Sequence, residues 1–294
     1  MIEVAGLTKR YGEHRAVDDL SFTAPAGKVT GFVGPNGAGK TTTFRCLLGL
    51  AEPTAGVALV DGLRYRDLAA PRRQVGAVLE SMGFHPARSG RNHLRVLARA
   101  AGIEPARIDP LLDLVGLRGA AERRVGGYSL GMRQRLGLAA ALLGDPPTIV
   151  LDEPVNGLDP AGVAWVRRLL RAWADEGRTV LVSSHLLAEL AQVADRVVVI
   201  RDGHRVTEAD VSSLAGSVTV RVDRPDAMVA ALLAAGVGHE LRGDGAISVP
   251  GCEPAEVGRI AARASVAVTE LARATVGDSL EAMFFTATGG DGRG

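Results

Sequence analysis

Short apolar runs, each followed by small or polar residues, recur along the first two thirds of the chain. Val29–Val33, Thr148–Leu151 and Thr179–Ser183 are almost continuously apolar, which is typical of strands buried on both faces of a parallel sheet. Helical spacing of apolar residues follows the later two runs, at Ala161–Glu176 and Leu186–Ala194. This alternation predicts an α/β fold whose parallel strands are joined by crossover helices.

Other apolar patterns surround these runs. Ile2–Leu7, Ala16–Phe22 and Gly56–Val60 have strand-like spacing, and Arg73–Leu79 reads as a further buried strand. From about Ser89 to Leu143 the pattern becomes helical, which predicts a helical insertion in the α/β domain.

A second region begins near Gly216, after the strand Val197–Ile200 and its turn. The expected elements there are strand 218–222, helix 226–235, strands near 237–241 and 246–249, helix 253–264 and strand 266–271. This βαββαβ order predicts a small α+β module of ferredoxin-like type. We therefore divide the chain into a first domain at 1–215, with a helical part at about 85–145, an accessory module at 216–288, and a disordered Gly-rich tail at 289–294.

The overall composition narrows the function classes. The 294 residues are 47% hydrophobic and carry a net charge of +1, which argues against a broad electrostatic grip on nucleic acid. The two cysteines, Cys46 and Cys252, lack zinc-site spacing and fit a reduced compartment. We expect no signal peptide, and no apolar stretch reaches the roughly 18–20 residues of a membrane helix. Any membrane spans must then come from another chain.

A glycine-rich loop follows the first buried run and precedes a helical pattern. It comprises Gly34, Pro35, Asn36, Gly37, Ala38, Gly39, Lys40 and Thr41, with Thr42 opening the helix. Strand, glycine-rich loop and helix are the context of a phosphate-binding loop, in which backbone N–H groups and the helix N-terminus face phosphate oxygens. Lys40 would reach the β- and γ-phosphates, and the Thr41 hydroxyl would bind Mg²⁺. The chain is predicted to bind a nucleoside triphosphate.

Two later apolar runs end in residues that suit the same chemistry. Thr148–Leu151 leads into Asp152 and Glu153, of which Asp152 would contact Mg²⁺ and Glu153 would polarise the attacking water. His185 follows the next strand, where its imidazole would hydrogen-bond the γ-phosphate. Taken alone, these residues also fit solvated acids and a turn histidine. The neighbouring phosphate loop favours the catalytic interpretation.

Two further motifs have both a structural and a functional interpretation. Ser129 suits a helix N-cap, and the helix start formed by Ser129, Leu130, Gly131 and Met132 is also a good anion site. Asp159 closes a short run with Asn156 and Gly157 that otherwise reads as a simple turn.

These motifs, taken in order, resemble the ATPase subunit of an ATP-binding cassette (ABC) transporter over roughly residues 1–213. Walker A is Gly34–Thr41, the signature is Ser129–Gln134, Walker B is Ile149–Asp152 followed by Glu153, the D-loop is Gly157–Asp159 and the H-loop is His185. The resemblance implies a P-loop NTPase core with a parallel sheet, an antiparallel β subdomain and a helical subdomain, to which the C-terminal α+β module is added.

The same resemblance implies the partners and the roles of further residues. Two such domains would pack head to tail, either as a homodimer or with a paralogous ATPase. Each ATP, with Mg²⁺, would lie between the Walker A of one subunit and Ser129 and Gly131 of the other. Tyr11 matches the aromatic residue that stacks on adenine. Separate transmembrane permease subunits would place the chain at the cytoplasmic face of the membrane, where Phe84–Leu94 would meet a permease helix, and no nucleic acid is expected.

Two positions depart from the family pattern. Leu130 stands where the signature usually has a second glycine, and Glu80 replaces the glutamine that usually follows the Arg73–Leu79 strand. The Glu80 carboxylate adds negative charge near Mg²⁺ and the water, and we expect it to contact the metal. Together with the C-terminal segment Ser279–Phe285, these two substitutions resemble features of the ATPases of bacterial exporters for antibiotics, lipids or ions. An importer role stays open at this point.

Two other functions are weighed against this motor. A soluble ABC ATPase acting on ribosomes or DNA usually carries two cassettes or a long coiled coil, and this chain has neither pattern. A regulator that binds ATP without hydrolysing it is disfavoured by the complete set of Lys40, Thr41, Asp152, Glu153 and His185.

Overall fold

The computed structural model describes residues 1–80, 83–185, 190–214, 217–242 and 245–273. The chain divides into two compact units, Met1–His185 with Val193–Arg205, and Leu186–Gln192 with Val206–Gly294. The boundary predicted near Gly216 lies at a residue outside the described part. The two units are considered separately below.

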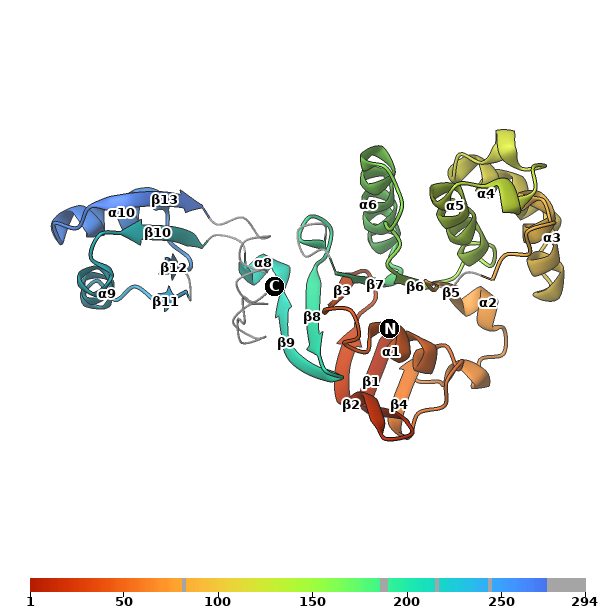
Figure 1. Ribbon diagram of the computed structural model, residues 1–294, viewed down its shortest axis with the longest axis horizontal. Helices are drawn as coiled ribbons and strands as arrows, with labels where there is room; N and C mark the ends of the chain where they lie inside the picture. Colours follow the sequence, from red (N-terminus) through yellow and green to blue (C-terminus); the bar gives the residue numbers. More distant parts are fainter. Residues whose placement is uncertain (81–82, 186–189, 215–216, 243–244, 274–294) are drawn as a thin grey trace. The chain divides into compact units, whose positions relative to one another are not determined.

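The main sheet has six strands in the order β5-β6-β7-β3-β8-β9 (Figure 1). Its strands are β3 (Val29–Val33), β5 (Val75–Val78), β6 (Thr148–Asp152), β7 (Thr179–Ser184), β8 (Arg196–Arg201) and β9 (His204–Asp210). The ladders from β5 to β8 are parallel, as the apolar runs predict. The register places Asp152 opposite Ser183 and Val33 opposite Ser184, so the carboxyl ends of these strands meet at one edge.

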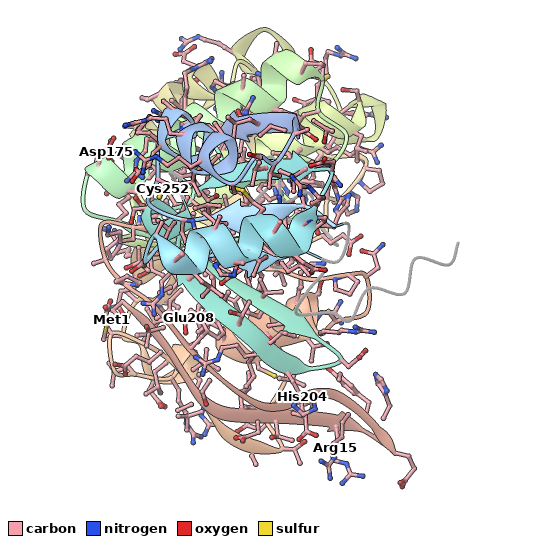
Figure 2. All side chains as sticks on the ribbon, turned by 90° about the vertical axis from the view of Figure 1, so that its left-hand side faces the viewer. Met1, Arg15, Asp175, His204, Glu208 and Cys252 are labelled. Carbon is pink, nitrogen blue, oxygen red and sulfur yellow. The ribbon has the colours of Figure 1, made fainter. Side chains whose placement is uncertain are left out.

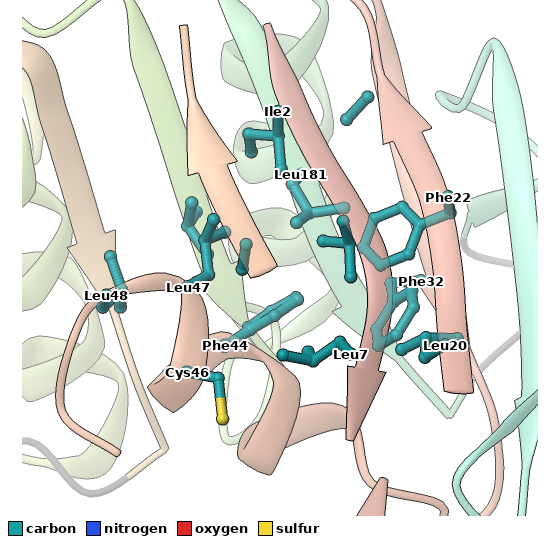
Figure 3. Close-up of a cluster of buried hydrophobic side chains, with 14 of the residues drawn as sticks. Ile2, Leu7, Leu20, Phe22, Phe32, Phe44, Cys46, Leu47, Leu48 and Leu181 are labelled. Carbon is teal, nitrogen blue, oxygen red and sulfur yellow. The ribbon is translucent and has the colours of Figure 1, made fainter. Parts of the chain in front are cut away.

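A three-stranded antiparallel sheet packs on this core. It contains β1 (Ile2–Tyr11), β2 (His14–Ala24) and β4 (Ala55–Val60), in the order β2-β1-β4. Between the two sheets and α1 (Lys40–Leu47), three rings stack in series, with centroids 4.9 Å apart for Phe22–Phe32 and 5.6 Å for Phe32–Phe44 (Figure 3). This apolar centre holds α1, and with it the preceding loop, against the sheet.

The turn between β8 and β9 is fastened to β2. The backbone N–H of Asp18 donates to Gly203 O at 3.0 Å, and Arg15 Nη1 donates to the Asp18 carboxylate at 2.8 Å. His204 Nε2 lies 3.6 Å from the same carboxylate, and Arg15 and His204 lie near each other in Figure 2. The Arg15 hydrogen bond holds the pKa of Asp18 below its usual value.

Helices occupy the region predicted to be helical. They are α3 (Gly90–Ala100), α4 (Ile108–Leu114) and α5 (Leu130–Ala141), and α6 (Pro160–Asp175) follows β6 (Figure 1). Short 3₁₀ turns lie at Tyr65–Asp67, Pro105–Arg107, Arg118–Ala120 and Val125–Gly127.

The strand predicted at Arg73–Leu79 is partly wrong. Residues Pro71–Gln74 form the short helix α2, and only Val75–Val78 are β5. Pro71 stands at the first helical position, where its fixed φ favours a helical turn, and Arg72 and Arg73 are exposed.

The second unit has the predicted βαββαβ order. After α8 (Val211–Leu214) come β10 (Val218–Val222), α9 (Pro225–Ala234), β11 (Glu240–Leu241), β12 (Ile247–Val249), α10 (Pro254–Arg263) and β13 (Val268–Arg273). The antiparallel strand order is β11-β12-β10-β13, as in ferredoxin-like modules. Of the helix predicted at 186–194, residues 186–189 lie outside the described residues, and 191–193 form a turn.

Candidate functional site

The loop between β3 and α1 approaches β2 closely enough to require glycine at one position. Gly39 has φ +102°, and a Cβ placed on it would lie 2.4 Å from Ala16 O. Gly39 is also the N-cap residue of α1 and provides no side-chain hydrogen bond to the first turn. The N–H groups at the start of α1 therefore have no side-chain cap, as suits a phosphate site.

Lys40 is almost completely buried behind this loop. Its Nζ donates to the carbonyl oxygens of Gly34 at 2.6 Å and Pro35 at 3.3 Å, and lies 3.5 Å from Glu153 Oε1. The side chains of Lys40 and Glu153 are only 7% and 8% exposed. A buried charge of this kind is tolerated only when it is paired and hydrogen-bonded, so the ion pair is an integral part of the site.

Thr41 and Asp152 form an oxygen pair at the end of β6. The Thr41 hydroxyl donates to Asp152 Oδ2 at 2.7 Å, and the Ser183 hydroxyl donates to Asp152 Oδ1 at 2.6 Å. Hydroxyl and carboxylate oxygens are the donors Mg²⁺ prefers, and Mg²⁺ commonly takes few protein ligands beside phosphates and water. The donor set fits this ion, although the described residues include no cluster of three acidic, histidine or cysteine ligands.

Glu153 adopts a backbone conformation that is unusual for a residue with a side chain. Its φ is +49°, and its N–H donates to Ser183 Oγ at 2.9 Å. Glu153 Oε2 lies 2.9 Å from His185 Nδ1. Ser183 thus holds both acids, since it donates to Asp152 and accepts from Glu153. Such strain is kept where the surroundings fix it, often at functional sites.

Lys40, Thr41, Glu153 and His185 line one pocket with a volume of about 550 Å³. Asp152 does not line it and is joined to the lining through its hydrogen bond with Thr41. Most of the predicted site residues line it, including Lys40, Thr41, Glu80, Glu153 and His185. The others from the prediction are Tyr11, Pro35, Asn36, Gly37, Gly39 and Thr42. Sequence reasoning did not assign His14, Ala16 and Asn156 to the pocket, although Asn156 stands only three residues after Glu153 and His14 pairs with Tyr11 across the β1–β2 turn.

Tyr11 lies at the mouth of the pocket, at the end of β1. Its ring is about half exposed, and Lys9 Nζ lies 4.9 Å from the ring centroid. Glu80 is likewise exposed at the pocket wall. Gly34 and Ala38 belong to the same loop but are buried within it, with no surface toward the pocket.

The signature residues and Asp159 stand apart from this pocket. None of the five described residues Ser129, Leu130, Gly131, Met132 and Asp159 lines it. Ser129 is the N-cap of α5, where Oγ accepts from the N–H of Met132 at 3.2 Å. Asp159 is the N-cap of α6, where Oδ1 accepts from the N–H of Gly162 at 2.8 Å. The N-cap role of Ser129 is the structural role that its sequence context allowed, whereas Asp159, which otherwise read as part of a simple turn, is also an N-cap.

Comparison with known proteins identifies the family. A model of the ABC transporter family matches residues 17–156. Bacitracin transport ATP-binding protein BcrA of Enterococcus faecalis is 40% identical over 217 residues, covering 73% of this chain and 70% of that protein. The chain is a member of the ABC transporter ATP-binding family. Lantibiotic transport ATP-binding protein SrtF of Streptococcus pyogenes is 36% identical over 212 residues, covering 71% of this chain and 91% of that protein.

Solved ABC cassettes have the same fold. The ATP-binding subunit of an ABC transporter matches with a TM-score of 0.67 at 29% identity, over 73% of this chain and 91% of that chain. The dimeric bacterial cassette MJ0796 matches with a TM-score of 0.66 at 24% identity, over 71% of this chain and 98% of that chain. A second family model, a domain of unknown function (DUF8746), matches residues 216–281.

ABC ATPases as a family bind and hydrolyse ATP. In this chain, Lys40 and residues of the glycine-rich loop line one pocket. Within the described part of the chain, we find no helix with the length and hydrophobicity needed to span a bilayer.

Proposed function

We propose that the chain is the ATP-hydrolysing motor subunit of an exporter and works at the cytoplasmic face of the membrane. The observation that carries the proposal is the meeting of Lys40, Asp152, Glu153 and His185 around the glycine-rich loop. Each of these groups has a distinct part in phosphoryl transfer.

In the proposed mechanism Lys40 neutralises the β- and γ-phosphates, with the N-terminus of α1 and the loop N–H groups beside it. Thr41 and Asp152 would hold Mg²⁺, which would supply charge neutralisation at the phosphates. Glu153 orients the attacking water and accepts its proton, and Ser183 fixes its backbone. His185 Nδ1 lies 2.9 Å from Glu153 Oε2. In the proposed mechanism the His185 imidazole hydrogen-bonds the γ-phosphate.

The separate location of the signature supports a two-chain site. Ser129, Leu130, Gly131 and Met132 do not line the pocket of their own chain, so an ATP contact from these residues requires a second subunit. We propose a head-to-tail dimer, formed with a second copy or a paralogous ATPase, in which the partner's ATP meets Ser129, Gly131 and the D-loop with Asp159.

Mixing two defective chains tests this shared site. A Ser129→Arg chain combined with a Lys40→Ala chain gives mixed dimers in which one site carries both defects and the other carries neither. We expect ATPase activity above that of either parent. Activity equal to the parents would contradict the shared site.

The names of the relatives support antibiotic export as the transport function. BcrA is a bacitracin and SrtF a lantibiotic transport ATP-binding protein, and for this chain we propose an antibiotic or another small molecule as cargo. The relatives give the ribosome- or DNA-acting alternative no comparable support.

Separate permease subunits would dock at a groove of about 320 Å³ whose lining includes two residues of the predicted segment Phe84–Leu94. Phe84 and His93 line the groove, with ring centroids 4.9 Å apart, and Leu50 and Leu97 add apolar surface. An apolar groove with a charged rim from Arg72 suits a short amphipathic helix.

Recovery of the complex from native membranes tests the transport assignment. Tagged Glu153→Gln protein is purified in mild detergent with ATP, and its partners are identified by mass spectrometry. We expect a stoichiometric polytopic membrane protein, which the groove variant Leu97→Arg fails to retain. Ribosomes or repair factors as the sole partners would overturn the exporter proposal and leave the ATPase chemistry in place.

The accessory module at 216–288 is proposed to stabilise the dimer, to sense a ligand or to gate hydrolysis. Removal of residues from Gly216 onward, followed by measurements of self-association and ATPase rate, separates these roles. Loss of association at an unchanged rate per dimer would assign the module to assembly.

A further inference from the structure

The first turn of α5 packs against the loop that joins Glu153 to α6. A Cβ placed on Gly157 would lie 2.2 Å from Leu130 Cδ2 and 2.5 Å from Leu130 Cγ. A Cβ on Gly131 would lie 3.3 Å from both Gly157 O and Leu158 Cδ2. The Leu130 side chain therefore occupies the space over Gly157, and the loop can pass beneath it only as glycine, whose φ there is +76°.

This loop begins at the strained residue of the site. Its two turns are closed by Asn156 N–H to Glu153 O at 3.2 Å and Leu158 N–H to Val155 O at 3.1 Å. Both bonds join residues three positions apart, so they fix the turns within the loop. The position of the loop as a whole depends on the residues that pack against it. The positive φ of Glu153 persists only where the surrounding residues hold it. The contact of Leu130 with Gly157 is one of the contacts that hold this loop, and so it helps to fix the direction of the Glu153 carboxylate.

A second contact joins α5 to α6 itself, further along the chain. The Arg135 guanidinium of α5 lies 4.8 Å from the centroid of the Trp165 ring of α6, a cation–π arrangement. Arg135 Nη1 also donates to Val115 O at 3.3 Å. Helix α5 thus contacts the loop through Leu130 and contacts α6 through Arg135, which limits how far the loop can move from α5.

We propose that Leu130 is a positioning residue for ATP hydrolysis, acting through Gly157 on the loop that carries Glu153. The proposal rests on the hydrolytic function proposed above. Leu130 is 60% exposed, so its contribution to the hydrophobic core is small and its loss leaves the fold largely intact. The glycine that the family usually has at this position would leave the space over Gly157 empty.

A double-mutant cycle measures this coupling inside one chain. Alanine at 157 must adopt a positive φ in any background, but it collides with Cγ and Cδ2 only when Leu130 is present. We expect Gly157→Ala to lower kcat about 100-fold in the wild-type background and only about tenfold in the Leu130→Ala background. Leu130→Ala alone is expected to lower kcat about tenfold, measured at saturating ATP, and Leu130→Met to regain most of that loss.

The control is Leu114→Ala on α4, another exposed leucine and far from the loop in sequence, which leaves kcat unchanged. Thermal midpoints of all variants are compared, and the coupling must appear in kcat for proteins that melt within a few degrees of wild type. An equal effect of Gly157→Ala in both backgrounds would overturn the role of Leu130 while the wild-type ATPase stands. A wild-type protein without ATPase activity would overturn the proposed function and this inference together.

Discussion

The two units of the chain bury different kinds of side chain. Around the pocket of the first unit, Lys40, Asp152, Glu153 and Ser183 are all at least nine-tenths buried. In the described part of the second unit, the core consists of apolar side chains such as Met228, and the buried polar residue there is Ser217. Burial of charge costs free energy unless each charge is paired, whereas burial of apolar surface stabilises directly. The groups to which we assign catalysis are therefore those whose burial costs the most free energy.

Ion pairing and hydrogen bonds in the first unit offset the free-energy cost of burying these charges. The Lys40–Glu153 pair and the hydrogen bonds of Ser183 to Asp152 and Glu153 satisfy the buried groups. The same groups are those to which we assign ATP hydrolysis. The α9–α10 core of the second unit offers no such cluster among its described residues, so we expect changes there to act on stability and not on nucleotide affinity.

The largest effect is expected for Lys40→Ala. It removes contacts to two phosphates, each a charge-assisted interaction, which together contribute about 3–6 kcal/mol, or roughly 10²–10⁴-fold in Kd for ATP. Titration with a fluorescent ATP analogue measures the loss, and exposed Lys28→Ala is the matched control. Wild-type affinity in Lys40→Ala would refute the assignment of the phosphate loop.

The next largest effect concerns Met228→Ala in the second unit. Met228 is fully buried between α9 and the sheet, so the cavity costs about 2–5 kcal/mol in the free energy of unfolding of that unit. Amide hydrogen exchange over residues 217–273 reports this, with exposed Leu233→Ala on the same helix as control. A parallel loss of ATP affinity would break the separation of roles between the two units.

Tyr11→Ala is expected to have a smaller effect at the pocket mouth. Loss of the aromatic face that would stack on adenine costs about 1 kcal/mol, or roughly fivefold in Kd for ATP. Tyr11→Phe keeps the face and should keep the affinity. If Tyr11→Ala binds ATP and GTP as tightly as wild type does, the ring does not contact the base.

The smallest effect is a pH dependence of stability at His93. His93 is buried, with 7% of its surface exposed, and its Nδ1 has no hydrogen-bond partner. Burial, followed by the charges of Arg88 and Arg72, lowers the pKa of His93 below 6.5. As pH falls below about 6.5, His93 therefore binds a proton more readily in the unfolded chain than in the folded protein. Proton binding then favours the unfolded state, so the free energy of unfolding declines on acidification.

Denaturant unfolding from about pH 7.5 to about pH 5.5 measures this decline. His93→Leu should reduce the slope. An unchanged slope in His93→Leu would assign the pH dependence to other groups.

The sequence predicts the parts of the site that depend on strand ends. Apolar runs at β3, β6 and β7 imply a parallel sheet, and the carboxyl ends of parallel strands meet at one edge. Lys40, Asp152 and His185 follow these runs, so their proximity can be predicted from the sequence alone. The βαββαβ order of the second unit follows from alternation in the same way.

Other features depend on neighbours that are remote in sequence. The bonds of Ser183 to two acids 30 and 31 residues earlier, and the packing of Leu130 over Gly157, arise only when helices and strands assemble. The positive φ of Glu153 has no local signal, since glutamate rarely adopts it. At Pro71–Gln74 the local preference of proline for a helix start prevailed over the strand pattern.

The most direct test of the account compares ATP binding with ATP hydrolysis in Glu153→Gln. Glutamine keeps the size of the side chain but cannot accept the proton of the attacking water. We expect Kd for ATP within about threefold of wild type and a single-turnover hydrolysis rate at least about 100-fold lower. Hydrolysis at the wild-type rate would contradict the central claim that Glu153 activates the water, and would direct attention to Glu80, which lines the same pocket.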